Sequence, residues 1–233
     1  MSRSSADFID LQLLSDGCRV GTGSRAIVHA RPEGEAIWPE ALASTLPAKA
    51  KVRATIGDSH LRYLVCRWPK TLRGRVEREA WLAHQFRQVH EIDSAQWQII
   101  ADADAVDAPF VACAMPRRLE TELRALIDRA GARLVSLSGQ FVRQFNAHCP
   151  TMSETHGALV VVEGGRMTLG SWRDGHWTRV VSRPMADGDA DVAARELAQL
   201  KVTGEVAANG TLYVCGARMG APAGWNVSVM EIA

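Results

Sequence analysis

The sequence has few cysteines, and none of them is spaced for metal binding. The five cysteines, Cys18, Cys66, Cys113, Cys149 and Cys215, are scattered, and no two have the C-x-x-C spacing of a zinc or redox site. Because their number is odd and the chain is not small, we expect buried free thiols in a reducing cytosol rather than a disulfide framework. No H-E-x-x-H motif is present either, so no metal site is predicted.

Long apolar runs and an excess of charge are also lacking. No apolar run approaches the ~20 residues of a spanning helix, and the polar start of the chain is not followed by the apolar region of a signal peptide. We therefore expect a soluble protein that reaches a membrane only through a partner. The formal net charge of +1 gives no overall electrostatic reason to expect nucleic acid or an anionic membrane as a partner.

Apolar runs and turn residues predict two similar halves. Residues 8–14, 18–22 and 25–30 form one antiparallel three-strand meander, and residues 158–163, 167–173 and 177–183 form another, with Gly-Gly and Asp-Gly turns that suit hairpins. The other predicted strands are 51–56, 61–68, 97–101, 110–115, 133–137, 210–215 and 227–232. The predicted helices are 36–46, 73–90, 116–130, 141–147 and 192–200.

A meander followed by helix–strand crossovers, occurring twice, is the pattern of a duplicated ribonuclease H-like fold, which is the architecture of the actin-like ATPases. We therefore predict a degenerate α/β protein of this class. Residues 1–150 are expected to form the first subdomain, with an inserted strand–helix segment. Residues 151–233 are expected to form a second, trimmed subdomain.

In an actin-like ATPase the first turn of each meander cradles phosphates with backbone N–H groups, and an aspartate there positions Mg²⁺ and water. The first meander offers two candidates. Asp10-Leu11-Gln12 lacks the glycine of the family's D-x-G turn, and Asp16-Gly17-Cys18 lacks the spacer residue and the hydroxyl residue. The second meander offers Glu163, Gly164, Gly165 and Thr168, but the bulky Arg166 and Met167 stand where a phosphate needs close approach. Gly216 could be the relic of an adenosine loop. These residues are either a vestigial nucleotide site or ordinary turns.

The segment Gly57-Asp58-Ser59-His60-Leu61 resembles the nucleophile box of GDSL-type hydrolases. A catalytic Ser59 would need a histidine base and an acidic residue to orient it. No histidine of the chain has the expected aspartate three residues earlier. A turn between two strands is therefore the favoured interpretation, and a hydrolase is a less favoured one.

The helix at residues 73–90 is the first candidate for a partner surface. Its apolar face is predicted to contain Val76, Ala80, Ala83, Phe86 and either Val89 or His90. Arginines next to an exposed tryptophan are typical of interface hot spots, and the candidates are Arg73, Arg78, Trp81 and Arg87. A solvated helix face explains the same charges without a partner.

Residues 51–146 resemble the central part of PilM-type proteins. The resemblance rests on KVRATIGDS, LRYLVCRWP, VEREAWLAHQF, WQII and the run from PFVACAMPRR to FVRQFN, followed by the second meander. The chain is also similar to the cytoplasmic domain of GspL, a degenerate relative. The resemblance implies an actin-like fold at the cytoplasmic face of the bacterial inner membrane, in type IV pilus or type II secretion assembly.

PilM binds ATP and the cytoplasmic tail of a membrane partner, whereas GspL-like domains have lost nucleotide and bind the assembly ATPase. This sequence departs from PilM at both phosphate turns, and from full-length GspL by lacking a membrane helix and periplasmic domain. We therefore expect a non-catalytic scaffold, a pseudo-ATPase without cofactor, which binds a membrane partner's tail or an assembly ATPase. The alternatives are an ATP-binding protein that uses magnesium with atypical loops, and the Ser59 hydrolase.

Overall fold

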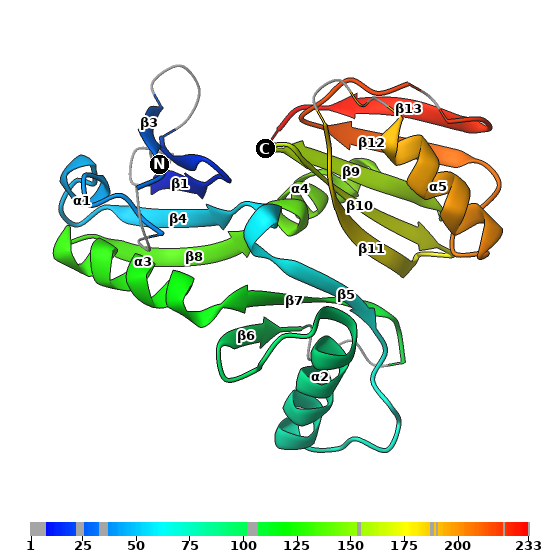
Figure 1. The fold of residues 1–233 in the computed structure, drawn as a ribbon, viewed down its shortest axis with the longest axis horizontal. Coiled ribbons are helices and arrows are strands. Elements are labelled where there is room, and N and C mark those ends of the chain that lie inside the picture. The colour runs from blue at the N-terminus through cyan, green and yellow to red at the C-terminus, as the bar shows by residue number, and fades with distance from the viewer. Residues whose placement is uncertain are drawn as a thin grey trace, which may run out of the picture.

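The computed structural model describes residues 8–21, 26–32, 37–101, 107–152, 155–186, 189, 191–220 and 222–232 (Figure 1). The strands are β1 Phe8–Leu13, β2 Gly17–Val20, β3 Ile27–Ala30, β4 Lys51–Ile56, β5 Arg62–Cys66, β6 Trp97–Ile100, β7 Phe110–Pro116, β8 Arg133–Gly139, β9 Gly157–Glu163, β10 Arg166–Arg173, β11 His176–Pro184, β12 Gly210–Cys215 and β13 Trp225–Met230. The helices are α1 Leu42–Thr45, α2 Arg75–His90, α3 Arg117–Arg129, α4 Gln140–His148 and α5 Val192–Val202, with 3₁₀ turns η3 Asp58–His60 and η4 Cys149–Thr151.

Two five-stranded sheets repeat one strand order. The first sheet has the order β3-β2-β1-β4-β8, and the second has β11-β10-β9-β12-β13. In each, the first three strands are antiparallel and the remaining two are parallel to the first. The duplicated α/β architecture predicted from the sequence is confirmed. The division at residue 150 stays a prediction, although it falls between the strands of the two sheets.

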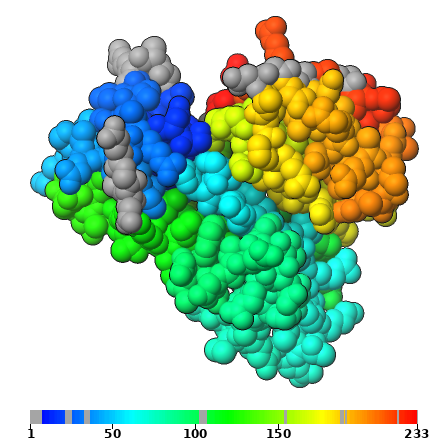
Figure 2. Space-filling model, viewed as in Figure 1, coloured from blue at the N-terminus to red at the C-terminus, as the bar shows by residue number. Residues whose placement is uncertain are grey.

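A third, smaller sheet is inserted between β4 and α3. Its strands have the order β5-β7-β6, and α2 packs against it. Figure 2 shows this insert as a lobe below the two others, with the first sheet's lobe in blue and green and the second's in yellow to red. The core of the insert contains Phe86 from α2 together with Phe110 and Ala112 from β7. The molecule therefore has three lobes, and the insert also packs against β11 of the second sheet.

Helix α3 covers one face of the first sheet as its pattern predicts. Leu119, Leu123, Leu126 and Ile127 are all at most 2% exposed and pack in the core that contains the inward residues of β1 and β4. The helix is followed by Gly131 with a φ of +66°, a conformation that glycine adopts readily. The predicted helix at 36–46 is much shorter in the structure, where α1 covers only Leu42–Thr45.

Helix α4 lies between the two large sheets (Figure 1). Phe141 is buried and packs edge-on to Tyr63 of the insert and near Trp177 of β11. On the second sheet, a Cβ built on Gly170 would lie 2.3 Å from the Phe141 ring. Only a glycine lets α4 come this close, so this residue sets the spacing between the helix and the sheet.

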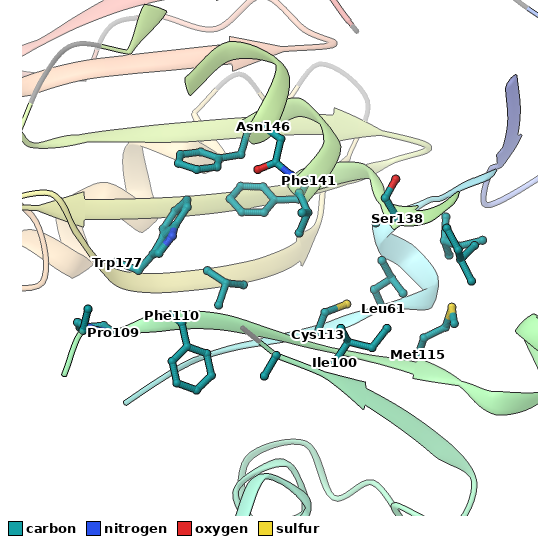
Figure 3. Close-up of a pocket in the computed structure, with 18 of the residues that line it drawn as sticks. Leu61, Ile100, Pro109, Phe110, Cys113, Met115, Ser138, Phe141, Asn146 and Trp177 are labelled. Carbon is teal, nitrogen blue, oxygen red and sulfur yellow. The ribbon is translucent and has the colours of Figure 1, made fainter. Parts of the chain in front are cut away.

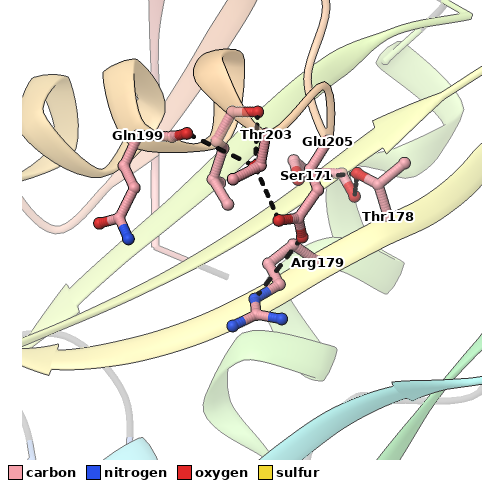
Figure 4. Close-up of polar contacts among 7 residues, drawn as sticks. Ser171, Thr178, Arg179, Gln199, Thr203 and Glu205 are labelled. Atoms are coloured by element: carbon pink, nitrogen blue, oxygen red, sulfur yellow. Dashed lines mark hydrogen bonds and ion pairs between the residues drawn. The ribbon is translucent and has the colours of Figure 1, made fainter.

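Helix α5 covers the opposite face of the second sheet with Ala193, Leu197 and Leu200. Its end is tied down by polar contacts, shown in Figure 4. The Thr203 hydroxyl donates to a Glu205 carboxylate oxygen (2.8 Å), and Glu205 forms an ion pair with Arg179 of β11 (3.7 Å). These contacts connect the helix to the outer strand of its sheet.

The predicted apolar face of α2 is wrong in part. Leu82 and Phe86 are the buried residues of the helix, whereas Val76 is 77% exposed and Val89 is 55% exposed. The reason is that α2 rests on a sheet of only three short strands, which covers a narrow stripe of the helix. This stripe contains Leu82 and Phe86, which are four residues apart, and Val76 and Val89 lie outside it.

The cysteines are free, and three of them are buried as predicted. Cys18, Cys66 and Cys215 lie in the core, Cys113 is half-buried and Cys149 is exposed. Within the part of the chain that the structure describes, no helix combines the length and apolarity needed to cross a membrane.

Candidate functional site

The first turns of the two meanders touch each other directly. The Ser15 hydroxyl, in the β1–β2 turn, donates a hydrogen bond to the Gly164 carbonyl in the β9–β10 turn (3.3 Å). Gly164 has a φ of +55°, and a Cβ built on it would lie 2.2 Å from Ser15 Oγ. A glycine is therefore required at this contact for both conformation and space.

The half-buried Glu163, with one carboxyl oxygen fully buried, lies beside this contact. Gln12 of β1 donates from Nε2 to Glu163 Oε1 at the end of β9 (2.8 Å). Glu163 Oε2 is buried and has no hydrogen-bond partner among the described residues. It lies 2.9 Å from the position of a Cβ built on Gly57, so the backbone after β4 closes over it.

Asp58 is the second buried carboxyl group, and it joins three elements. It accepts hydrogen bonds from the Tyr63 hydroxyl (2.6 Å) and from the backbone N–H of Phe141 (3.1 Å). Phe141 is in the first turn of α4, where backbone N–H groups lack partners within the helix. The Thr168 hydroxyl of β10 also interacts with Asp58, and it bonds with Ser182 at 3.1 Å.

Both carboxyl groups hold their protons more tightly than usual. Burial, followed by the charge of Asp58, raises the pKa of Glu163 from 4.5 to about 7. Burial raises the pKa of Asp58 from 3.8 to about 6, against the effects of its hydrogen bonds and of Arg166. The pair therefore changes protonation between weakly acidic and neutral pH.

Of the predicted cofactor residues, Glu163 is one of these two carboxyl groups, Thr168 interacts with the other, and Gly164 follows Glu163 in the turn. Gly165 follows in the turn with a φ of +69°, and its carbonyl accepts from the backbone N–H of Met185 (2.8 Å). Gly216 lies at the end of β12, where a Cβ would be 2.2 Å from the Val162 carbonyl oxygen. The absence of a side chain at Gly216 therefore lets the end of β12 lie close to β9.

Ser59 has no histidine partner among the described residues. His60, its neighbour in η3, is hydrogen-bonded through Nε2 to the Leu14 carbonyl (3.1 Å). Asp58 is engaged by Tyr63 and α4. The relay that a nucleophilic serine needs is therefore not assembled from these groups.

The predicted partner residues of α2 divide into two groups. The Arg78 guanidinium lies over the Trp68 ring (5.1 Å), and Trp81 packs on the same ring with centroids 5.6 Å apart. These two belong to the packing of the insert. Arg73 and Arg87 are exposed, so these two are the members of the predicted set that face solvent.

The sequence did not predict the large apolar groove between the insert, α4 and β11 (Figure 3). Its volume is about 810 Å³. Figure 3 shows Phe110 and Cys113 of β7 on one side, with Phe141 of α4 and Trp177 of β11 on the other. Its few polar groups include those of Ser138 and Asn146. The one feature of the sequence that pointed to this groove is the group of apolar residues Phe141, Val142 and Phe145 on α4.

The strand order, the touching turns and the inserted sheet can be compared with solved structures. The cytoplasmic domain of EpsL, an inner-membrane component of the type II secretion system of Vibrio cholerae, superposes with a TM-score of 0.57 at 12% identity over 96% of this chain and 85% of that one. The PilM-PilN type IV pilus biogenesis complex gives a TM-score of 0.61 at 10% identity over 90% and 81%. A Bacteroides thetaiotaomicron protein with an actin-like ATPase fold gives 0.55 at 12% identity over 91% and 82%.

The chain has the actin-like ATPase fold. The predicted resemblance to PilM-type and GspL proteins is thus confirmed at the level of structure. No protein-family model matches the sequence, and no curated protein is similar to it in sequence. The two touching turns are the ones that the sequence singled out as candidate phosphate turns. Among the described residues, no three His, Cys, Asp or Glu side chains gather to hold a metal ion.

Proposed function

We propose that this protein is a non-catalytic docking platform that holds an apolar peptide segment of a membrane-anchored partner. The observation that carries the proposal is the groove of about 810 Å³ between the insert, α4 and β11. Apolar, largely preformed grooves with few polar groups are typical binding sites. The lining aromatic rings supply the rigid apolar surface on which hot spots are built.

The similar structures favour a partner in membrane-associated assembly. EpsL is an inner-membrane component of a secretion system, and PilM was solved with PilN in a pilus biogenesis complex. For this protein we propose a peripheral position at the cytoplasmic face of the bacterial inner membrane, in a type IV pilus or type II secretion platform. The bound segment is the tail of a membrane protein. An assembly ATPase is the second candidate partner.

The absence of catalysis is supported by the turn pair. A direct hydrogen bond joins Ser15 to Gly164, and Gln12 reaches across to Glu163. In this arrangement, no room for phosphate is left between the turns, and Glu163 and Asp58 beside them are engaged by Gln12 and by Tyr63 and Phe141, respectively. These residues do not fit Mg-ATP, so we propose that the protein is a pseudo-ATPase.

A substitution at the rim of the groove tests the proposal. Ile100 lines the groove and is 53% exposed, and Ile27, on the outer strand β3, is 49% exposed and lies outside it. Ile100→Glu is expected to weaken binding of the cytoplasmic N-terminal peptide of the partner at least tenfold, because it places a charge against an apolar ligand.

Isothermal titration calorimetry with synthetic tail peptides of the inner-membrane pilus and secretion proteins of the same organism provides the measurement. Ile27→Glu is the matched control and should leave the affinity unchanged. If none of the peptides binds, or if both variants bind as the wild type does, the groove is not the docking site.

A further inference from the structure

Asp58 lies at the point where the insert meets α4. Its Oδ1 atom accepts two hydrogen bonds, one from the Tyr63 hydroxyl of β5 (2.6 Å) and one from the backbone N–H of Phe141 in the first turn of α4 (3.1 Å). Asp58 is 4% exposed, so bulk water does not compete for this oxygen. One carboxyl oxygen therefore joins a strand of the insert to the start of the helix.

The two bonds of Asp58 hold the walls of the apolar groove. Phe141 lines the groove from α4, and Cys113, the β7 residue that is opposite Tyr63 in the sheet register, lines it from the insert (Figure 3). A Cβ built on Gly139, which also lines the groove, would lie 2.4 Å from the Tyr63 hydroxyl oxygen. This end of the groove therefore keeps its shape while Tyr63 and Phe141 stay in place.

Charged and titratable side chains face Asp58 from the strands around it. Arg166 of β10 favours the carboxylate through its positive charge. The Cys113 thiol and the Tyr63 hydroxyl stay neutral, because burial, followed by the charge of Asp58, raises the pKa of each. Burial, followed by Asp58, also raises the pKa of Glu163 on β9, to about 7. Glu163 is therefore still protonated where Asp58 begins to ionise.

Protonation of Asp58 weakens both of its bonds. Burial raises the pKa of Asp58 from 3.8 to about 6, whereas the bonds from Tyr63 and Phe141 lower it. A contact that lowers the pKa of an acid is stronger with the carboxylate than with the neutral acid, and hydrogen bonds to ionised groups are roughly twice as strong as neutral ones. Around pH 6, Asp58 therefore changes from a weak to a strong hold on α4 as the pH rises.

From these contacts we propose that Asp58 is a proton-operated clamp that regulates peptide binding in the apolar groove. As a carboxylate it holds α4 against the insert, and the groove is already shaped for its peptide, which favours tight binding. Protonation loosens the wall that α4 forms, and the affinity falls. The clamp rests on the proposed function, because it regulates the same groove. Acidification then releases the peptide of the partner.

Calorimetric titration at several pH values between 5 and 7.5 tests the clamp. The probes are the tail peptides used with Ile100→Glu, made with blocked ends and without histidine. The wild type is expected to bind them about three- to tenfold more weakly at pH 5 than at pH 7.5. Asp58→Asn should bind equally at every pH, with the wild-type affinity at pH 5, because the amide resembles the neutral acid. Asp128→Asn, at an exposed position on α3, is the matched control and should follow the wild type.

Two further measurements do not depend on how Asp58→Asn folds or on a peptide. Tyr63→Phe removes a donor that favours the carboxylate, so the midpoint of the affinity change should move to higher pH. Hydrogen exchange of the Phe141 N–H, followed by NMR without peptide, reports on the clamp alone. After correction for the intrinsic exchange rate, its protection in the wild type should be about three- to tenfold higher at pH 7.5 than at pH 5.

The inference is overturned if Asp58→Asn keeps the pH dependence of the wild type. Histidines change charge in the same pH range, and His176 lines the groove, so a dependence that survives in Asp58→Asn would be assigned to His176. Protection of the Phe141 N–H that does not change with pH also overturns it. If no tail peptide binds at any pH, the proposed function fails, and the Phe141 N–H still shows whether Asp58 holds α4.

Discussion

Replacing Glu163 with glutamine is expected to raise the free energy of unfolding by about 3 kcal/mol at pH 8 and to change it little at pH 4. The pKa of Glu163 is raised by burial, and then by Asp58, from 4.5 to about 7 in the folded protein. Below pH 4.5 the carboxyl group is protonated in both the folded and the unfolded state, so its burial does not lower the free energy of unfolding. Between pH 4.5 and 7 the unfolded state ionises first, and stability falls.

The Glu163→Gln variant keeps the neutral form at every pH, and its amide oxygen can still accept from Gln12. Urea unfolding at pH 4, 6 and 8 measures the difference. Glu40→Gln, at an exposed position, is the control and should follow the wild type throughout. Equal stabilities of Glu163→Gln and wild type at pH 8 would show that the carboxyl group is not buried between the turns.

Replacing Phe141 with alanine is expected to destabilise the protein by about 3–5 kcal/mol, the usual cost of deleting a buried aromatic ring. Phe141 is 1% exposed and contacts Tyr63 of the insert and Trp177 of the second sheet, so its loss loosens all three lobes. Thermal unfolding measures the change. Phe8→Ala, at a 43% exposed ring, should cost far less.

A double-mutant cycle with Gly170 makes the same prediction sharper. Gly170→Ala alone should cost about 2 kcal/mol, because its Cβ would meet the Phe141 ring. In the Phe141→Ala background that cost should fall by about half or more. Additive costs would mean that α4 does not rest on β10 at this glycine.

Local patterns predicted the strands and helices well where turn chemistry was explicit. Lys51–Ile56 was predicted to the residue, since Pro47 stops the segment before it and a Gly-Asp-Ser turn follows. The α3 helix was predicted within a residue at each end because its leucines follow a helical period and Gly131 ends it. The α2 face was predicted only in part: Phe86 is buried and His90 packs against it, but Val76 and Val89 follow the same period without a surface to cover them.

The site could be predicted only in part, because its contacts join distant segments. Glu163 and Gly164 were recognised as a turn that could hold phosphate, but their contacts with Gln12 and Ser15 span about 150 residues. The groove is lined by Ile100, Ser138 and Trp177, from separate elements. No local pattern marks residues that only the folded chain brings together. Asp58 was read as part of a turn, and its burial emerges only from α4 and the insert.

The central claim is that the nucleotide position of this actin-like fold is closed, and calorimetric titration with Mg-ATP tests it most directly. We predict no binding heat at millimolar nucleotide, because the Ser15 and Gly164 turns are in contact. Micromolar binding that is abolished by Gly165→Trp but kept by Gly175→Trp would contradict the claim. Both glycines have positive φ in hairpin turns, at +69° and +74°, and only Gly165 belongs to the turn pair.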